Sequence, residues 1–209
     1  MDPVQNLFWI AEKGRRGEDW GAMKVEEVVL VDEADREVGR AEKLWAHQGG
    51  GKRHRAFSVM LLDGQGRVLL QRRAGGKYHF PGLWTNACCS HPRPGEGVLA
   101  AGQRRLTEEL GLDGVELREA GVFEYRAESQ ATGLWEWEVD HVLVGRWDGA
   151  AESLPVDASE VEAVRWASSA EIDAMVAEGR DVTPWFAIIW RRWREWGKAG
   201  PGEALEKGK

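Results

Sequence analysis

Several features are scarce or missing in this chain of 209 residues. It has only two cysteines, Cys88 and Cys89, which are adjacent and therefore poorly placed to bridge each other. No apolar run reaches a membrane-spanning length, and the first residues lack the basic-then-apolar order of a signal peptide. The net charge of −7 gives no footprint for nucleic acid. These absences exclude a disulfide scaffold and favour a soluble, cytoplasmic protein with no nucleic-acid partner and no membrane span.

The chain is long enough for one globular domain with a sizeable core, since 43% of its residues are hydrophobic. Strand-like and helix-like segments are mixed without a regular βαβ rhythm, which indicates an α+β fold. We expect residues 1–24 to be an N-terminal extension and residues 25–196 to form the domain. Residues 197–209 are rich in Gly, Lys and Glu, so we expect a disordered tail there.

Hydrophobic patterning predicts the elements of this domain. The predicted strands are 25–31, 37–40, 56–62, 67–71, 115–117, 122–126, 135–140 and 161–166. Two of them, 56–62 and 67–71, flank the turn Asp63-Gly64-Gln65-Gly66 and are interpreted as a β-hairpin. Helices are predicted between Gly95 and Gly111, over 170–176 and over 185–196. In the first helix, the spacing of Leu99, Leu106 and Leu110 predicts the buried stripe.

Five residues could together bind a divalent first-row metal. They are three histidines and two glutamates, His47, His54, His91, Glu136 and Glu138, and they offer three nitrogen and two oxygen ligands. The two glutamates share one face of a strand because side chains alternate along it. From spacing alone, we favour the simpler explanation of each histidine as a polar surface or loop residue, and of the two glutamates as the solvent-exposed face of an edge strand.

The helix that ends at Gly111 carries carboxylates that could hold a hard cation. Glu109, with Glu96 thirteen residues before it, offers oxygen ligands of the type that Mg²⁺ prefers. The alternative is an ordinary charged helix surface, which we keep for Glu108, paired with Arg104 at i,i+4. A basic group nearby could bind phosphate, although singly each member is explained as a solvated charge. Its members are Arg72, Arg73, Lys77 and Arg105.

Two further residue types suggest chemistry. Cys89 lies two residues before His91, and a neighbouring cation would favour its thiolate, so it could act as a nucleophile or an acid/base group. Cys88 points to the opposite side of an extended segment and is assigned to the core. Trp185, at a helix start, could cover a pocket and stabilise a cation, or could simply anchor the core.

Taken together, these residues resemble the type 1 isopentenyl diphosphate isomerases, a branch of the Nudix superfamily. The resemblance extends from Val25 to Trp193. Its most specific piece is Trp84-Thr85-Asn86-Ala87-Cys88-Cys89-Ser90-His91-Pro92. Supporting pieces are the two histidines His47 and His54, Trp135-Glu136-Trp137-Glu138 and Thr183-Pro184-Trp185.

The resemblance implies a Nudix-like mixed β-sheet core flanked by helices, and a role in isoprene biosynthesis. The reaction would convert isopentenyl diphosphate into dimethylallyl diphosphate. The implied acid/base residues are Cys89 and Glu138, with Tyr125 assisting and Trp185 facing the cationic centre. A monomer or a weak dimer is expected.

The resemblance also implies ligands. The first metal, which could be Mn²⁺, Mg²⁺ or Zn²⁺, would be bound by His47, His54, His91, Glu136 and Glu138. Glu109 would hold a Mg²⁺ that accompanies the substrate diphosphate. The residues implied to contact the diphosphate are Lys43, Arg73, Lys77 and Arg105.

The Nudix hydrolase signature, GX5EX7REUXEEXGU, is only partly kept. Glu96, Arg104, Glu108 and Glu109 fall in register, but Ser90 replaces the first glycine and Arg105 replaces a glutamate. The second change removes a carboxylate and adds positive charge suited to binding a diphosphate. The runner-up hypotheses are a Nudix hydrolase that cleaves a nucleoside diphosphate derivative and a regulatory metal- or phosphate-binding module without catalysis.

Overall fold

The computed structural model describes residues 26–198. The predicted extension, residues 1–24, and residues 199–209 of the predicted tail lie outside the described residues. The strands are β1 (Glu27–Val31), β2 (Glu37–Glu42), β3 (His54–Leu62), β4 (Val68–Arg73), β5 (Trp84–Thr85), β6 (Cys88–Ser90), β7 (Leu117–Glu128), β8 (Trp135–Arg146) and β9 (Val161–Ala167). The helices are α2 (Lys43–Ala46), α3 (Val98–Leu110), the 3₁₀ turn η1 (Ala151–Ser153), α4 (Ser169–Glu178) and α5 (Pro184–Lys198).

The strands form one mixed sheet in which β3 is the central element. Strand β8 pairs in parallel with β3 along its full length, from His54 opposite Glu138 to Leu62 opposite Arg146. The other edge of β3 is therefore shared by β1, β6 and β4, each paired antiparallel over a short stretch. Beyond this centre, β7 pairs with β8 and β9 pairs with β4. The expected α+β fold is thus confirmed.

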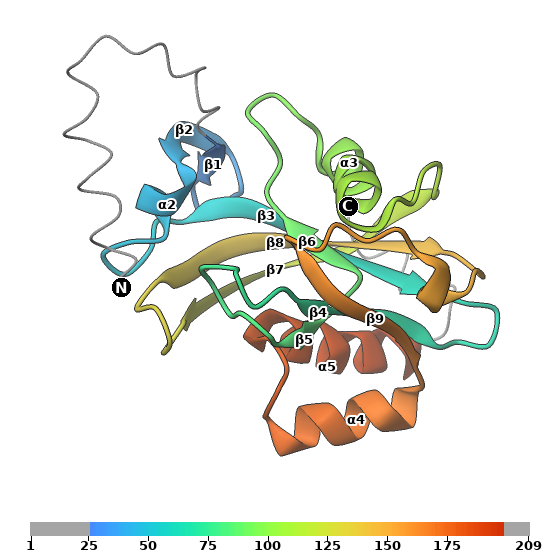
Figure 1. Ribbon diagram of the computed structural model, residues 1–209. Helices are drawn as coiled ribbons and strands as arrows, with labels where there is room; N and C mark the ends of the chain where they lie inside the picture. The colour runs from blue at the N-terminus through green and yellow to red at the C-terminus, as the bar shows by residue number, and fades with distance from the viewer. Residues whose placement is uncertain (1–25, 199–209) are drawn as a thin grey trace, which may run out of the picture.

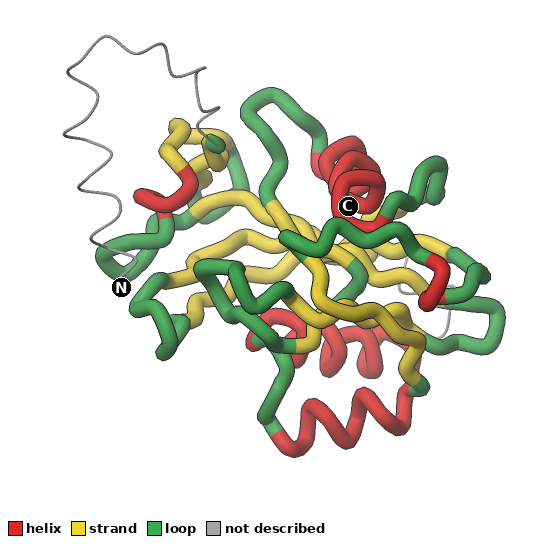
Figure 2. The backbone as a smooth tube through the Cα atoms, viewed as in Figure 1, coloured by secondary structure: helices red, strands yellow, loops and turns green. Residues whose placement is uncertain are grey.

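Helices cover both faces of the sheet, with α3 on one face and α5 and α4 on the other (Figure 1). Figure 2 shows the same arrangement, with the small β1–β2 unit and α2 at one end. On the α3 side, alternate residues Phe57, Val59 and Leu61 of β3 join Leu106 and Leu110 in one buried cluster. Met60, which lies between Val59 and Leu61 in β3, points to the α5 side. There it joins Phe186, Ile189 and Trp190 in a second cluster. This alternation explains why residues 56–62 read as a near-continuous apolar run.

The predicted β-hairpin is only partly present. The turn that follows Leu62 is correct, but β3 and β4 pair only through Leu62 and Val68 before they diverge. They diverge because β6 takes the same edge of β3, with Cys88 opposite Val59. A local pattern contains no information on a third strand that arrives from more than twenty residues downstream.

Two other expectations on the elements are wrong. The predicted strand 115–117 reaches the sheet only at Leu117, which begins the same strand, β7, that contains 122–126. A register shift between Glu119 and Gly121 interrupts β7. Such a bulge breaks the alternation that defines a strand in the sequence. Leu99 does not belong to the buried stripe, because it lies in the first turn of α3 and is 41% exposed. The helix instead buries Ala101 and Gly102 there, and the Leu106–Leu110 part of the stripe is confirmed.

The two C-terminal helices agree with the sequence, whereas α2, β5 and η1 were not predicted. Helix α5 begins at Pro184, directly after Thr183, as a first-turn proline predicts. Helix α4 begins with a capping box between Ser168 and Glu171. Among the helices of residues 26–198, none is both long and apolar enough to cross a membrane.

Candidate active site and metal centre

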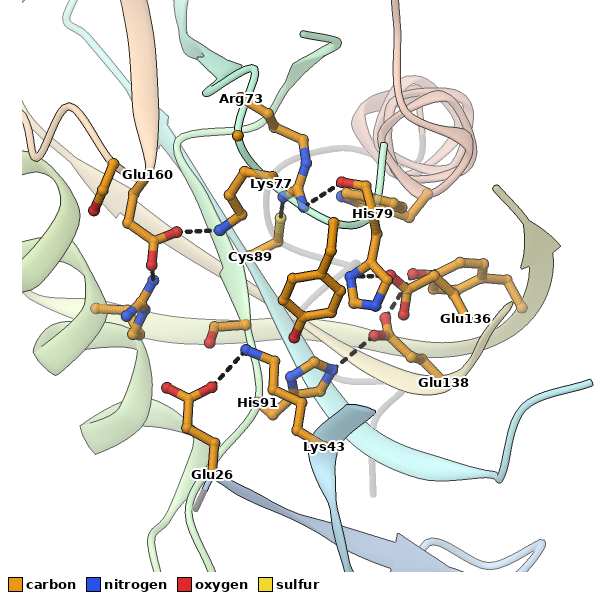
Figure 3. Close-up of a pocket in the computed structure, with 17 residues that line it drawn as sticks. Glu26, Lys43, Arg73, Lys77, His79, Cys89, His91, Glu136, Glu138 and Glu160 are labelled. Atoms are coloured by element: carbon orange, nitrogen blue, oxygen red, sulfur yellow. Dashed lines mark hydrogen bonds and ion pairs between the residues drawn. The ribbon is translucent and has the colours of Figure 1, made fainter. Parts of the chain in front are cut away.

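A cavity of about 240 Å³ lies at the end of the sheet where β3 and β8 begin and β6 ends. Figure 3 shows its wall, in which cationic, acidic, imidazole, thiol and aromatic side chains converge. The predicted site residues that line it are Lys43, Arg73, Lys77, Cys89, His91, Arg105, Tyr125, Glu136, Glu138 and Trp185. The structure therefore brings together residues from seven helices and strands and from the loops after β4 and β6 in one chamber.

Strand register explains how the chemistry-bearing side chains meet. The parallel pairing of β3 with β8 places His54 directly opposite Glu138. The antiparallel pairing of β3 with β6 places Ser58 opposite Cys89, so His91 follows at the end of β6 near the start of β3. Because successive residues of β6 point to opposite faces, the thiol of Cys89 lines the cavity. The other cysteine of the pair is fully buried on the α3 side, as predicted.

His47 reaches the site from the short helix α2. Glu42 caps this helix by accepting hydrogen bonds from the first two free backbone N–H groups, at 2.8 and 2.7 Å. The chain then turns through glycines with positive φ, and a side chain at Gly51 would press on Trp135 at 3.2 Å. The backbone N–H of Trp135 donates to the carbonyl of His47 at 2.8 Å. These contacts fix α2 against the start of β8.

The five predicted metal ligands form one compact group. One ligand atom from each of His47, His54, His91, Glu136 and Glu138 lies within 4.8 Å of all the others. The Nε2 atom of His47 is 2.9 Å from Glu136 Oε2, and that of His91 is 2.9 Å from Glu138 Oε1. The Nε2 atoms of His54 and His91 lie 3.0 Å apart. The interpretation of these residues as separate loop and surface positions is excluded.

Backbone carbonyls orient two of the imidazoles. His47 Nδ1 lies 2.6 Å from the carbonyl oxygen of Lys43, and His54 Nδ1 lies 2.7 Å from that of Lys52. An Nδ1–H donated in this way leaves Nε2 as the free lone pair that faces the group, which is the arrangement around metal-binding histidines.

The donor set fits a divalent cation. His47 Nε2 and Glu136 Oε2 are buried, and within the described part of the chain neither has a hydrogen-bond partner of good geometry. Burying such polar atoms without compensation is costly, and two adjacent carboxylates also repel each other. A cation shared by imidazole nitrogens and carboxylate oxygens would satisfy all of these atoms. The donor types do not select among Mn²⁺, Mg²⁺ and Zn²⁺.

Tyr125 and Asp140 extend the network around Glu138. Tyr125 donates its hydroxyl hydrogen to Glu138 Oε2 at 2.6 Å. Burial acts to raise the pKa of Glu138, but hydrogen bonding and charge from His54, with the hydroxyl of Tyr125, lower that pKa to about 2. Burial and the Glu138 charge raise the pKa of Tyr125 and of Asp140 well above their usual ranges. Asp140 accepts a hydrogen bond from Ser58 at 2.8 Å.

Cys89 lies beside a buried arginine. Arg73 Nη1 is 3.5 Å from the sulfur, and the same guanidinium donates to the backbone carbonyls of His79 and Phe80 at 3.0 and 3.1 Å. It also lies 5.4 Å from the ring of Trp185. Burial raises the pKa of Cys89 to about 12, although the charge of Arg73 opposes this. Arg73 was expected to contact the diphosphate. In the structure it also lies beside the thiol of Cys89 and the ring of Trp185.

Three other cations of the cavity are paired with acids. Lys43 Nζ lies 2.8 Å from Glu26 Oε2. Lys77 contacts Glu160, and Arg105 Nη2 lies 3.1 Å from the second oxygen of the same carboxylate. Burial raises the pKa of Glu160, but Lys77 and Arg105 outweigh it and lower the pKa to about 2. The cations are thus present at the cavity as predicted, and each is held by a carboxylate.

Glu109 lies behind this wall and is 1% exposed. Its Oε1 accepts hydrogen bonds from Arg105 at 3.0 and 2.6 Å and from Cys88 at 3.3 Å, and its Oε2 accepts one from Gln71 at 3.1 Å. Both oxygens are therefore already engaged by protein donors. The interpretation of Arg104 and Glu108 as a pair is confirmed at 3.1 Å, and Arg104 also binds Glu96.

Sequence reasoning missed several residues of the site. Glu26 and Glu160 line the cavity, and His79 is buried against Glu136. No motif marked the two acids, since each lies far along the chain from the cation that it binds. His79 lies two residues after Lys77, and this nearness to a phosphate-binding candidate was the one signal that could have found it.

Comparison with known proteins gives consistent results. A model of the NUDIX domain matches residues 52–186. "Isopentenyl-diphosphate Delta-isomerase" of Nocardia farcinica is 52% identical over 163 residues, which is 78% of this chain and 91% of that protein. The protein of the same name from Streptomyces griseus is 52% identical over 160 residues, 77% of this chain and 79% of that protein. A solved structure from Deinococcus radiodurans superposes with a TM-score of 0.65 at 21% identity, covering 80% of this chain and 98% of that one.

Proposed function

The chain belongs to the NUDIX domain family and, within it, to the isopentenyl-diphosphate Delta-isomerases, and from this premise we propose how its cavity works. The enzyme interconverts isopentenyl diphosphate and dimethylallyl diphosphate. The conversion moves a carbon–carbon double bond by one position, so it needs a proton donor, a proton acceptor and protection of the intermediate charge. No phosphate bond has to break.

We assign the diphosphate to the cationic side of the cavity. Lys43, Lys77 and Arg105 converge there, and their charges are compensated by Glu26 and Glu160. A diphosphate supplies the same type of oxygen acceptor as these carboxylates, with a higher charge density, and can therefore take over their hydrogen bonds. This exchange would hold the hydrocarbon end toward Cys89 and Glu138.

The proton transfers are assigned to Cys89 and Glu138. Both side chains line the cavity, and the hydroxyl of Tyr125 anchors the Glu138 carboxylate at 2.6 Å. One group would add a proton to the terminal alkene carbon and give a tertiary carbocation. The other would remove a proton from the neighbouring carbon and give the allylic product. The order of the two is left to experiment.

Aromatic groups would protect the carbocation from water. Trp185 is 3% exposed, lines the cavity and packs against Phe80 and Tyr125, with ring centroids 5.3 and 6.2 Å away. Its π face offers electrostatic stabilisation of a cation without a nucleophilic atom. The two earlier interpretations of Trp185, pocket cover and core anchor, are therefore compatible, because the residue belongs to both the cavity wall and the second core cluster.

Metal ions would complete this site. His47, His54, His91, Glu136 and Glu138 would hold a divalent cation, which would offset their lone pairs and carboxylate charges and supply Lewis-acid character next to Glu138. Glu109 stays the predicted ligand of a Mg²⁺ that accompanies the diphosphate, and in that role it would have to exchange Arg105 for the ion. A cytoplasmic location and a monomeric or weakly dimeric state also remain predictions.

One observation carries this assignment. The thiol of Cys89, three members of the metal-type His/Glu group and the ring of Trp185 line the same chamber as three cationic side chains. The group members are His91, Glu136 and Glu138, and the cations are Lys43, Lys77 and Arg105. A hydrolase needs a metal-bound water beside the diphosphate, whereas here the acid/base groups are grouped with an aromatic face.

Turnover of isopentenyl diphosphate by Cys89→Ala and by Cys88→Ala tests the assignment. The adjacent cysteine is a matched control, since it is fully buried on the other face of β6. We expect Cys89→Ala to lower kcat by about 10²- to 10⁴-fold, the usual contribution of a general acid or base. Cys88→Ala should lower thermal stability while keeping much of the activity.

Product analysis separates the alternatives. Formation of dimethylallyl diphosphate by the wild-type protein, and its loss in Cys89→Ala, supports the proposed roles. Release of phosphate or pyrophosphate would favour a Nudix hydrolase, and no turnover in metal-replete protein would favour a regulatory module. Full activity of Cys89→Ala would remove the thiol from the mechanism but leave the isomerase activity intact.

A further inference from the structure

His79 is a buried histidine next to the metal-type group, to which it does not itself belong. It lies in the connection between β4 and β5 and is 5% exposed. Its Nδ1 atom is 3.5 Å from Glu136 Oε1 (Figure 3). Its ring centroid is 4.3 Å from that of His47. The proposed chemistry assigns it no role.

The two oxygens of the Glu136 carboxylate face two different histidines. Its Oε2 faces His47 Nε2 at 2.9 Å, inside the group of potential ligands, while its Oε1 points outward to His79. Carboxylates that bind metals through one oxygen commonly accept a hydrogen bond at the other, which fixes the rotation of the group. His79 occupies the place of that donor.

The ring of His79 is held in this orientation by its surroundings. The backbone carbonyl of His79 accepts a hydrogen bond from Arg73 at 3.0 Å, and the Tyr78 ring packs next to the imidazole of His79, with ring centroids 4.1 Å apart. Its Nε2 atom is buried and has no hydrogen-bond partner among residues 26–198. The Nδ1 atom is therefore the ring atom of His79 that makes a polar contact, and this contact is with Glu136.

We propose that His79 is a positioning residue of the metal centre: its Nδ1–H donates to Glu136 Oε1 and thereby directs Oε2 toward the cation. The structure shows the two atoms in contact at 3.5 Å, which is longer than an ordinary N–H···O hydrogen bond, so the hydrogen bond itself is part of the proposal. This inference rests on the proposed metal centre, because it gives His79 a function only if the five ligands bind a cation.

Three substitutions distinguish the two ring nitrogens. His79→Asn keeps a donor near the Nδ1 position, His79→Gln moves the polar group to the Nε2 position, and His79→Phe removes both while filling the space. The readouts are the affinities for Mn²⁺ and for Zn²⁺, from competition with a chelator of known affinity, and the Tm of the metal-free protein. Activity is not needed for either measurement.

A matched control comes from another buried histidine. His141 is 8% exposed and lies 2.9 Å from Asp35, on a different face of β8 from the ligands. His141→Asn should lower the Tm of the metal-free protein and leave both metal affinities unchanged.

We expect His79→Phe to weaken metal binding by about 10- to 100-fold, the range found for residues that orient metal ligands. His79→Gln should resemble it, and His79→Asn should recover most of the affinity. Recovery by His79→Gln instead of His79→Asn would overturn the proposal in favour of direct ligation through Nε2. Unchanged affinity in all three variants would reduce His79 to a packing residue. Absence of metal binding by the wild-type protein would refute the metal centre and, with it, this role.

Discussion

Replacing Tyr125 by phenylalanine removes one oxygen atom from the cavity and leaves the ring in place. The hydroxyl donates to Glu138 Oε2 at 2.6 Å, and Tyr125 itself is 7% exposed. The ring keeps its contacts with Phe123 and Trp185, at centroid distances of 5.7 and 6.2 Å. The substitution therefore isolates a single hydrogen bond to the carboxylate assigned to proton transfer.

The magnitude follows from the type of bond. A hydrogen bond to a charged group contributes roughly 1.5–3 kcal/mol. At about 1.4 kcal/mol for each factor of ten, its complete loss in the transition state lowers kcat by about 10- to 150-fold. This is an upper range, since part of the bond energy is also present in the ground state. In the proposed mechanism Glu138 gains or loses a proton, so the strength of this bond would change during the reaction and we expect a measurable part of it in kcat.

The assay is steady-state turnover of isopentenyl diphosphate, together with metal affinity and Tm. Tyr78→Phe is a matched control, since the only other tyrosine of the chain also lines the cavity but is 40% exposed and has no hydrogen bond to Glu138. It should leave kcat close to the wild-type value. A kcat of Tyr125→Phe equal to that of the wild type, with metal bound, would refute the role of Tyr125 in anchoring Glu138.

Two further predictions concern stability. Ser58→Ala should lower the free energy of unfolding by about 1–3 kcal/mol, because the buried Asp140, which is 1% exposed, would lose the 2.8 Å hydrogen bond to its Oδ2 atom. Urea unfolding measures this change, and an unchanged midpoint would contradict the prediction. Glu160→Gln should destabilise the protein above pH 4.5, because burial is outweighed by Lys77 and Arg105, which lower the pKa of Glu160 from 4.5 to about 2. The charged carboxylate stabilises the fold above its unfolded-state pKa and loses this effect as the pH falls toward the folded-state pKa. The difference in the free energy of unfolding between wild type and variant should therefore decrease over that pH interval. A difference that stays constant with pH would show that the charge of Glu160 is not its cause.

The sequence predicts those parts of the fold that depend on local pattern. The alternation at the start of β8 correctly places Glu136 and Glu138 on one face, and Pro184 correctly marks the start of α5. Pairing between distant strands is not contained in such patterns. The bulge in β7 and the insertion of β6 beside β3 both arise from contacts across the sheet, and both led to wrong expectations.

The site shows the same division. Residue types and a family resemblance suffice to nominate the five metal-type residues and Cys89. Their convergence depends on the parallel register of β3 and β8, which sets His54 opposite Glu138. The partner acids Glu26 and Glu160 could not be nominated, because a counter-ion is defined by distance in space and has no motif of its own. For the buried His79, the only signal was its position two residues after Lys77.

Arg105 connects the departure from the hydrolase signature to the geometry of the cavity. It stands where that signature has a glutamate, and its guanidinium contacts Glu109 at 2.6 Å and Glu160 at 3.1 Å. The side chain is 13% exposed, and its charge is held at the cavity wall by acids from α3 and from the loop before β9. Burial opposes the charge of Arg105, but Glu109 and Glu160 outweigh it and raise its pKa. A carboxylate at this position would add to the negative charge of Glu109, whereas the arginine makes the same wall attractive to a diphosphate. Under the proposed function, this arginine would favour binding of the diphosphate over its cleavage, and the proton transfers would fall to Cys89 and Glu138.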